Sequence, residues 1–167
     1  MKKTIYLLLF IGFSTSGIAQ DSLVNKNNLF IELYGSAGIY SLNYERVYLI
    51  SPALNLTSRV GFAYLGLSSP WNLNIISCPV SFSALLGKHD NRIELGISCA
   101  YYTQNVAETD KNDRNNLLNG LIIGYRLQPK NKHVIIRITY TPLLKKSLNS
   151  NERSFYQAGG FSFGYSF

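Results

Sequence analysis

The sequence predicts an all-β fold: an eight-stranded antiparallel up-and-down transmembrane β-barrel with a side-chain-filled lumen. Three observations predict it. The hydrophobic pattern has a period of two along most of the chain, with no competing helical period. Each of eight segments has one unbroken apolar face, and the opposite faces are small and polar, rich in Gly, Ser and Ala with few charges. Successive side chains of a strand point to opposite faces, so each segment is expected to form a two-faced strand.

The length and composition indicate one domain with few charged residues. The chain has 167 residues, of which 46% are hydrophobic and 15% charged; an average soluble domain carries about 25% charged residues. The net charge of +7 is scattered, without a basic helix or a Lys/Arg run, so we expect no nucleic-acid partner. Beyond the N-terminus no apolar stretch reaches the roughly 18 residues of a transmembrane helix.

The N-terminus has the three parts of a secretory signal. Lys2 and Lys3 supply the positive charge, Ile5–Phe13 is a short apolar core, and Gly17 and Ala19 are small residues before the expected cleavage site. No Cys follows the apolar core, so a lipoprotein signal is not indicated. The expected organisation is a signal peptide over residues 1–19, a short periplasmic leader over 20–28 and an outer-membrane barrel over 29–167.

The alternation defines eight strands in order. We expect them at Leu29–Ser36, Ile39–Tyr48, Ala53–Leu65, Leu73–Gly87, Arg92–Tyr102, Leu117–Leu127, His133–Thr141 and Phe155–Phe167. A soluble barrel would turn the apolar faces inward, whereas a transmembrane barrel turns them toward lipid. The small residues of the other faces suit a narrow lumen and make a poor solvated surface. Strands of about 9–13 residues also suit a tilted membrane crossing, so we expect the apolar faces to point outward.

The connections and the aromatic residues agree with a membrane barrel. Short periplasmic turns are expected at Leu49–Pro52, Lys88–Asn91 and Gln128–Lys132, and longer outer loops at Gly66–Asn72, Thr103–Asn116 and Pro142–Ser154. The first outer connection, at Ala37–Gly38, is expected to be tight. Aromatic girdles are expected from Tyr40, Tyr64, Trp71 and Tyr101 at the outer edge and from Tyr44, Tyr48, Tyr125 and Tyr165 at the periplasmic edge.

The chain ends in AGGFSFGYSF, a strand with one aromatic face. Phe161, Phe163, Tyr165 and Phe167 are predicted to face lipid, while the small residues between them face the lumen. With the signal peptide and the eight two-faced strands, this ending resembles the small outer-membrane β-barrel proteins of Gram-negative bacteria, of the OmpA/OmpX type. The resemblance implies an integral outer-membrane location among outer-membrane lipids, and a C-terminal strand that the barrel-assembly machinery reads. It names an architecture and no activity.

Seven charged residues fall on predicted lumen faces. They are Glu32, Glu45, Arg59, Arg92, Glu94, Arg126 and Arg137. The expected strand order puts Glu45, Arg92, Glu94 and Arg126 near the periplasmic end and the other three near mid-height. An eight-stranded barrel is just wide enough for its own side chains, and unpaired buried charges are costly. We therefore expect a structural ion-pair network that fills the lumen, with a gated ion path as the alternative.

Residues suited to catalysis or cross-linking are few. The histidines are His89 and His133, both expected at periplasmic turns, far from the outer rim where lipid-modifying barrels need them. The expected turn puts Cys78 and Cys99 opposite one another on the lipid face, where either a disulfide or two free thiols are possible. We expect no enzyme activity, metal or cofactor. The expected role is structural, or surface interaction through the outer loops; the alternatives are a narrow pore or, less favoured, a lipid-modifying enzyme.

Overall fold

A computed structural model of the chain describes residues 25–67, 73–88, 90–106, 115–129, 132–148 and 153–167. The predicted signal peptide lies outside the described residues. The predicted leader over residues 20–28 lies partly outside them, and its last two residues already belong to the first strand. Within the described residues, no helix is long and apolar enough to cross a membrane.

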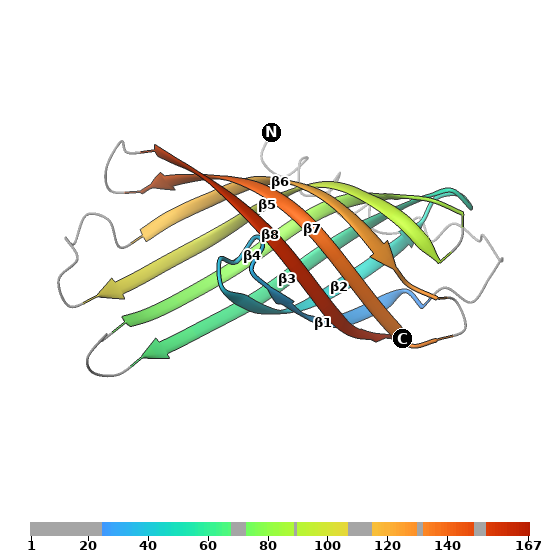
Figure 1. Cartoon of the computed structure of the whole chain (residues 1–167), viewed down its shortest axis with the longest axis horizontal. Coiled ribbons are helices and arrows are strands. Elements are labelled where there is room, and N and C mark those ends of the chain that lie inside the picture. The colour runs from blue at the N-terminus through green and yellow to red at the C-terminus, as the bar shows by residue number, and fades with distance from the viewer. Residues whose placement is uncertain (1–24, 68–72, 89, 107–114, 130–131, 149–152) are drawn as a thin grey trace, which may run out of the picture.

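Eight antiparallel strands close into an up-and-down barrel in sequence order, and the first pairs with the last (Figure 1). This confirms the predicted all-β architecture and the number of strands. Their bounds are β1 Asn27–Leu33, β2 Tyr40–Leu49, β3 Leu54–Leu67, β4 Leu73–Leu86, β5 Asn91–Val106, β6 Asn115–Leu127, β7 Val134–Ser147 and β8 Arg153–Ser166.

The wall of the barrel has the two faces that the alternation predicted. Along β2 the side chains of Ser41, Asn43 and Glu45 are buried in the interior, while those of Leu42 and Tyr44 between them are exposed on the outside. The same alternation appears in the other strands, except at outer ends such as residues 153–157 of β8, which are all exposed. The apolar residues therefore point out of the barrel, and the interior is mostly polar.

Several strands run further than predicted, so the connections at the outer end are shorter. β7 continues to Ser147 although Pro142 was expected to begin a loop. The register with β8 continues through Pro142↔Gln157, while the β6–β7 pairing is interrupted between Gly120↔Leu143 and Ile123↔Tyr140. Proline lacks only the backbone N–H donor, so it removes hydrogen bonds to one neighbouring strand and the strand itself can continue. β5 likewise runs to Val106, beyond the predicted end at Tyr102.

The first outer connection, in contrast, is longer than predicted. β1 ends at Leu33 and β2 begins at Tyr40, so residues 34–39 form a loop in place of a tight turn at Ala37–Gly38. Gly35 and Gly38 have φ angles of 90° and 97°, a region that glycine enters without a steric penalty. The loop folds inward, because Ser36 and Ala37 are each only 2% exposed.

The two cysteines are free and exposed on the outer face. The expectation that they lie opposite one another was wrong, because the β4–β5 register pairs Cys78 with Tyr101 and Val80 with Cys99. The connection, residues 87–90, is four residues long as predicted, but the hairpin is centred one residue later than Cys78 opposite Cys99 would require, since Leu86 pairs with Ile93. The pairing is therefore shifted by two residues and leaves both cysteines on the same face. Their diagonal placement does not bring them into direct cross-strand pairing.

We therefore expect two reactive thiols and no disulfide in the folded protein. Unfolding in denaturant without reductant should allow both Cys78 and Cys99 to be alkylated, which mass spectrometry of the intact chain would show as two additions. A Cys78→Ser variant is the control and should take one addition. A wild-type protein that takes up alkylating reagent only after reduction would contradict the described register.

Candidate functional site

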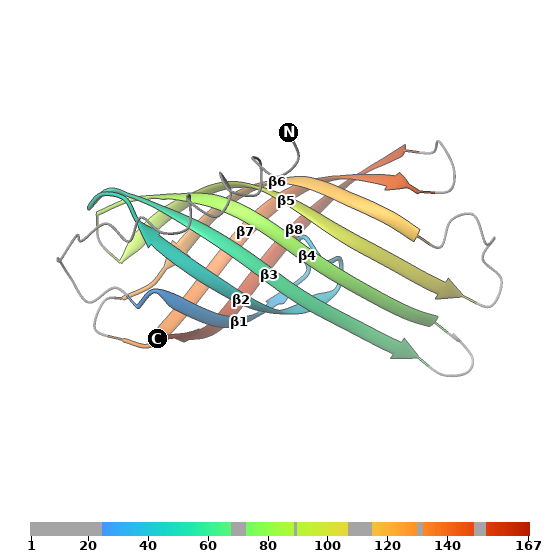
Figure 2. The ribbon, with the colours of Figure 1, turned by 180° about the vertical axis from the view of Figure 1, so that it is seen from behind.

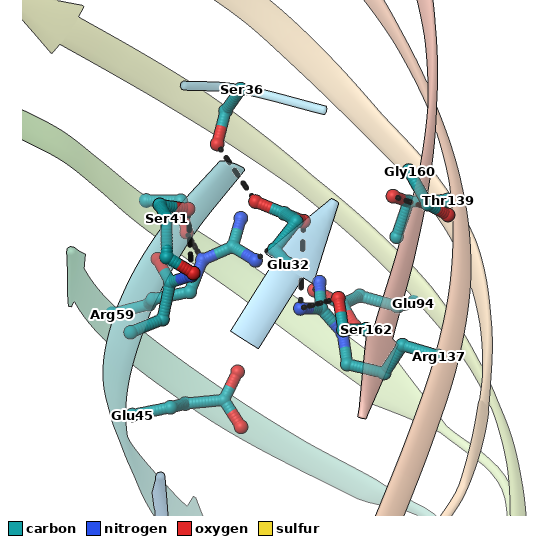
Figure 3. A network of polar contacts seen from close by, with 12 residues as sticks. Glu32, Ser36, Ser41, Glu45, Arg59, Glu94, Arg137, Thr139, Gly160 and Ser162 are labelled. Atoms are coloured by element: carbon teal, nitrogen blue, oxygen red, sulfur yellow. Dashed lines mark hydrogen bonds and ion pairs between the residues drawn. The ribbon is translucent and has the colours of Figure 1, made fainter. Parts of the chain in front are cut away.

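The most organised polar feature of the molecule is a network of side chains inside the barrel at mid-height (Figure 3). Six of the seven predicted lumen charges belong to it, and each is 3% exposed or less. Each strand contributes one member. In strand order the members are Glu32, Glu45, Arg59, Ser81, Glu94, Arg126, Arg137 and Ser162.

We call this set of side chains the lumen network, and we call the end of the barrel where β1 begins its lower end. Arg126 joins two carboxylates in the lower part of the lumen network. Its Nη1 and Nη2 donate to the two oxygens of Glu45, each at 2.7 Å. The same Nη2 lies 3.0 Å from Glu94 Oε2. A planar guanidinium matches a carboxylate in this two-bond geometry, and such bonds are stronger than those between neutral groups. Asn28 adds a bond from its Nδ2 to Glu45 Oε1 at 2.8 Å.

Glu94 connects the lower half of the lumen network to the upper half. Arg137 donates to it from Nε at 2.9 Å and from Nη2 at 2.8 Å. Arg137 Nη1 also lies 3.8 Å from Glu32 Oε1, to which Arg59 donates at 3.2 Å. The two groups of charges that the sequence placed at different heights thus form one continuous chain.

An aromatic side chain that the sequence analysis did not single out lies between two of the arginines. The ring centroid of Phe30 is 5.0 Å from Arg137 Cζ and 5.9 Å from Arg59 Cζ, within the range of cation–π attraction. Phe30 is only 1% exposed. The sequence alternation could have placed Phe30 in the lumen, because Phe30 lies two residues before Glu32 and so shares its face of β1.

Replacing Phe30 with Leu should remove both cation–π contacts while keeping the site apolar. We expect the free energy of unfolding to fall by about 1–2 kcal/mol, the size of such contacts when they are desolvated together with a small cavity. Phe163→Leu on the outer face of β8 is the matched control and should change stability little. Urea unfolding of both variants checks this, and equal effects would contradict a specific role for Phe30.

The seventh predicted charge, Arg92, lies apart from the lumen network. It is 4% exposed and sits one position below Glu94 on the inner face of β5, where its Nη1 meets the side-chain amide of Asn55. Below the lumen network, Gln128 Nε2 bonds to Ser166 Oγ at 2.7 Å and to Asn28 Oδ1 at 3.1 Å. These polar groups continue the packing of the lumen toward the end where β1 begins and β8 ends.

This arrangement is suited to holding strands together and filling the lumen. Three carboxylates face three guanidinium groups in the network, so the charges of the network balance, and the buried Arg92 lies outside it. Among the described residues, no group of three or more His, Cys, Asp and Glu side chains could hold a metal. His133 stacks on Tyr165 outside the lumen, with ring centroids 5.1 Å apart, and His89 lies outside the described residues.

The outer surface carries a belt of exposed apolar side chains on all eight strands. Tyrosines lie near its two edges with hydroxyls bound to polar partners. Tyr44 and Tyr125 donate to Asn27 and Asn91 at 2.9 and 2.8 Å near the end where β1 begins, and Tyr101 donates to Asn115 at 3.1 Å near the other end. Tyr40, Tyr48, Tyr64 and Tyr165 are also exposed. Trp71, the remaining predicted girdle residue, lies outside the described residues.

The C-terminal strand closes the barrel. Phe161, Phe163, Tyr165 and Phe167 all point outward and are 47–57% exposed. On the inner side of β8, Ser162 and Ser166 are fully buried. The backbone N–H of Asn27 donates to the Phe167 carbonyl at 2.9 Å, and the Phe167 N–H donates to the Asn27 carbonyl at 2.8 Å. The last strand is thus held to the first up to its final residue.

The fold and the lumen define the class of this protein: a closed eight-stranded antiparallel β-barrel with an apolar exterior and a polar, side-chain-filled interior. No protein-family model and no curated protein matches the chain.

Proposed function

We propose that this protein is an integral outer-membrane β-barrel of a Gram-negative bacterium, with a structural or surface-interaction role through its extracellular loops. The observation that carries the proposal is the apolar exterior of a closed barrel. Residues such as Ile138 and Phe82, 61% and 59% exposed, belong to a continuous belt that no other part of the described chain covers. Soluble monomers rarely expose patches beyond a few hundred Å², whereas lipid covers such a belt.

The two ends of the barrel support an orientation. The start of β1 and the end of β8 meet at one end, where two of the three connections, 50–53 and 87–90, have only four residues and the third, 128–133, has six. The connections at the other end have five to eight residues. Outer-membrane barrels have short turns on the periplasmic side. We therefore assign that end to the periplasm and the connections after β1, β3, β5 and β7 to the outside. In this proposal the partners are outer-membrane lipids and, through β8, the barrel-assembly machinery.

The filled lumen favours this role over a pore. Arg126 and Arg137 are fully buried and each is tied to carboxylates from other strands, so an ion would have to displace charge-assisted bonds to pass. An open channel of the porin type needs many more strands.

Expression of the full chain in a Gram-negative host tests the proposal. A tag inserted within residues 107–114 should be cut by protease added to whole cells, and the protein should fractionate with the outer membrane. A tag inserted within residues 87–90 is the matched control and should be cut only after the outer membrane is opened. Recovery in the soluble periplasmic fraction would contradict the proposal.

A further inference from the structure

The apolar belt has a groove of about 460 Å³ on the outer face of β2–β5. The strands β2, β3 and β4 lie side by side in Figure 2. The outward side chains that line the groove are Tyr48, Leu56, Phe82, Ala84 and Ile97. Ala84 is the small residue among them, and the four large side chains are 41–59% exposed. The groove therefore lies where one outward side chain is too short to fill the space between its neighbours.

A cation lies beside this groove on the outer face of β2. Arg46 is exposed, and the register places Ser58 between it and Phe82 of the groove. Its Nη1 donates to Asn27 Oδ1 at 2.9 Å, which leaves Nη2 and Nε as further donors. Arg46 forms no ion pair with any of the described residues, so none of them neutralises its positive charge.

The position of this cation on the barrel is unusual. In the strands as described, the other outward-facing charges are Lys146 and Arg153, at the upper ends of β7 and β8. Arg46 is the outward charge of the lower half. A charged side chain on the lipid face of a barrel costs free energy that increases with depth. An anion at the membrane interface would lower that cost.

Two hydroxyl groups lie between Arg46 and the groove. Tyr48 Oη and Ser58 Oγ are 3.1 Å apart, and neither has another hydrogen-bond partner among the described residues. One hydroxyl donates to the other, so the second hydrogen of the pair remains free to donate to a third group. A phosphate oxygen accepts such bonds strongly because it is charged. The pair therefore extends the anion-binding chemistry of Arg46 to the edge of the groove.

The strand positions put the cation closer to the lower end than the groove. Arg46 is three residues from Leu49, where β2 ends, whereas Ile97 is six residues from Asn91, where β5 begins. In a bilayer the headgroups lie at the interface and the acyl chains point toward the middle. A phospholipid beside this wall would therefore meet Arg46 with its phosphate and the groove with an acyl chain.

We propose that this surface binds one phospholipid of the periplasmic leaflet, with its phosphate at Arg46 and the Tyr48–Ser58 hydroxyl pair and one acyl chain in the groove. The inference rests on the proposed membrane location and orientation. The chain buries apolar surface on both partners, and the phosphate supplies the negative charge that Arg46 lacks. Binding therefore depends on two separable features, the charge of Arg46 and the open space over Ala84.

Native mass spectrometry of the refolded protein in a neutral detergent tests this. The protein is mixed with equal amounts of dioleoyl phosphatidylglycerol and dioleoylglycerol, which has the same acyl chains and no phosphate. We expect one phosphatidylglycerol per chain, retained several-fold more than dioleoylglycerol. Arg46→Gln should remove this preference, and Arg46→Lys, which keeps the charge, should restore part of it. Ala84→Leu should lower the retention of both lipids several-fold, because the added side chain fills the groove.

Two outward-facing changes away from the groove are the matched controls for charge and bulk. Lys146→Gln and Cys78→Leu should retain lipid as the wild type does. Equal retention of the two lipids by the wild type would overturn the inference, and this comparison needs no substitution. Unchanged retention in Arg46→Gln or Ala84→Leu would overturn it too, as would a dimer that Ala84→Leu disrupts. A wild type that fails to float with phosphatidylcholine vesicles would instead overturn the proposed membrane location.

Discussion

Replacing Glu94 with Gln should lower the free energy of unfolding by about 3–5 kcal/mol, the cost of leaving a buried charge without its partner. Glu94 accepts two bonds from Arg137 and one from Arg126, and it is 1% exposed. The amide of Gln carries no charge and can accept with only one oxygen. Arg126 and Arg137 then lose a negatively charged partner, and the network has one excess positive charge. Water cannot readily reach that part of the lumen to solvate it.

A compensating change separates this electrostatic cost from a general packing defect. Adding Arg137→Gln to Glu94→Gln restores the charge balance of the network, so the double variant should be more stable than the sum of the single effects predicts. Urea unfolding in vesicles, followed by the fraction of protein that migrates as folded on gels, measures all three variants. Strict additivity would contradict a coupled network. Arg46→Gln, an exposed arginine on β2, should change stability little.

Gly164→Ala should prevent or strongly destabilise closure of the barrel. A Cβ built on Gly164 would overlap the carbonyl oxygen of Leu29 and the Cα and Cβ of Phe30, all belonging to β1. Backbone atoms of a paired strand cannot move aside as a flexible side chain can. We expect a loss of about 3 kcal/mol or more, at the upper end of overpacking effects, seen as a large fraction of protein that never becomes resistant to SDS.

Gly159→Ala is the matched control for this prediction. It lies on the same strand, and the nearest atom to its added Cβ is the Thr139 carbonyl oxygen at 4.0 Å, an ordinary contact. Folding yield and unfolding midpoint should therefore match those of the wild type. If Gly164→Ala folds as well as Gly159→Ala, the close approach of β8 to β1 described here is wrong.

The alternation alone was enough to predict the fold and the inner face. Buried and exposed residues alternate along the strands, so the sequence correctly placed all of the predicted charges inside. The same alternation could also have placed Phe30 there. The partners could not be predicted in the same way, because they depend on register, and register depends on where each turn is centred. The two-residue shift between β4 and β5 that separates Cys78 from Cys99 is one such case.

The features that the pattern missed have local physical causes. Pro142 was predicted to begin an outer loop, but in the barrel it removes bonds to one neighbouring strand only and β7 continues past it. The inward fold of loop 34–39 depends on positive φ angles at Gly35 and Gly38, and on Ser36 Oγ reaching Glu32 Oε2 at 3.4 Å. No period-2 pattern carries that information.

The proposed membrane location requires the apolar exterior to face lipid, and heat modifiability of the purified protein in lipid tests this most directly. The chain would be refolded into phosphatidylcholine vesicles and run on SDS gels with and without boiling, with Gly159→Ala alongside. We predict that the unboiled protein floats with the vesicles and migrates as a compact band that shifts on heating. A protein that stays soluble without lipid and shows one band in both lanes would contradict the account, because its apolar side chains would then have to be covered by protein.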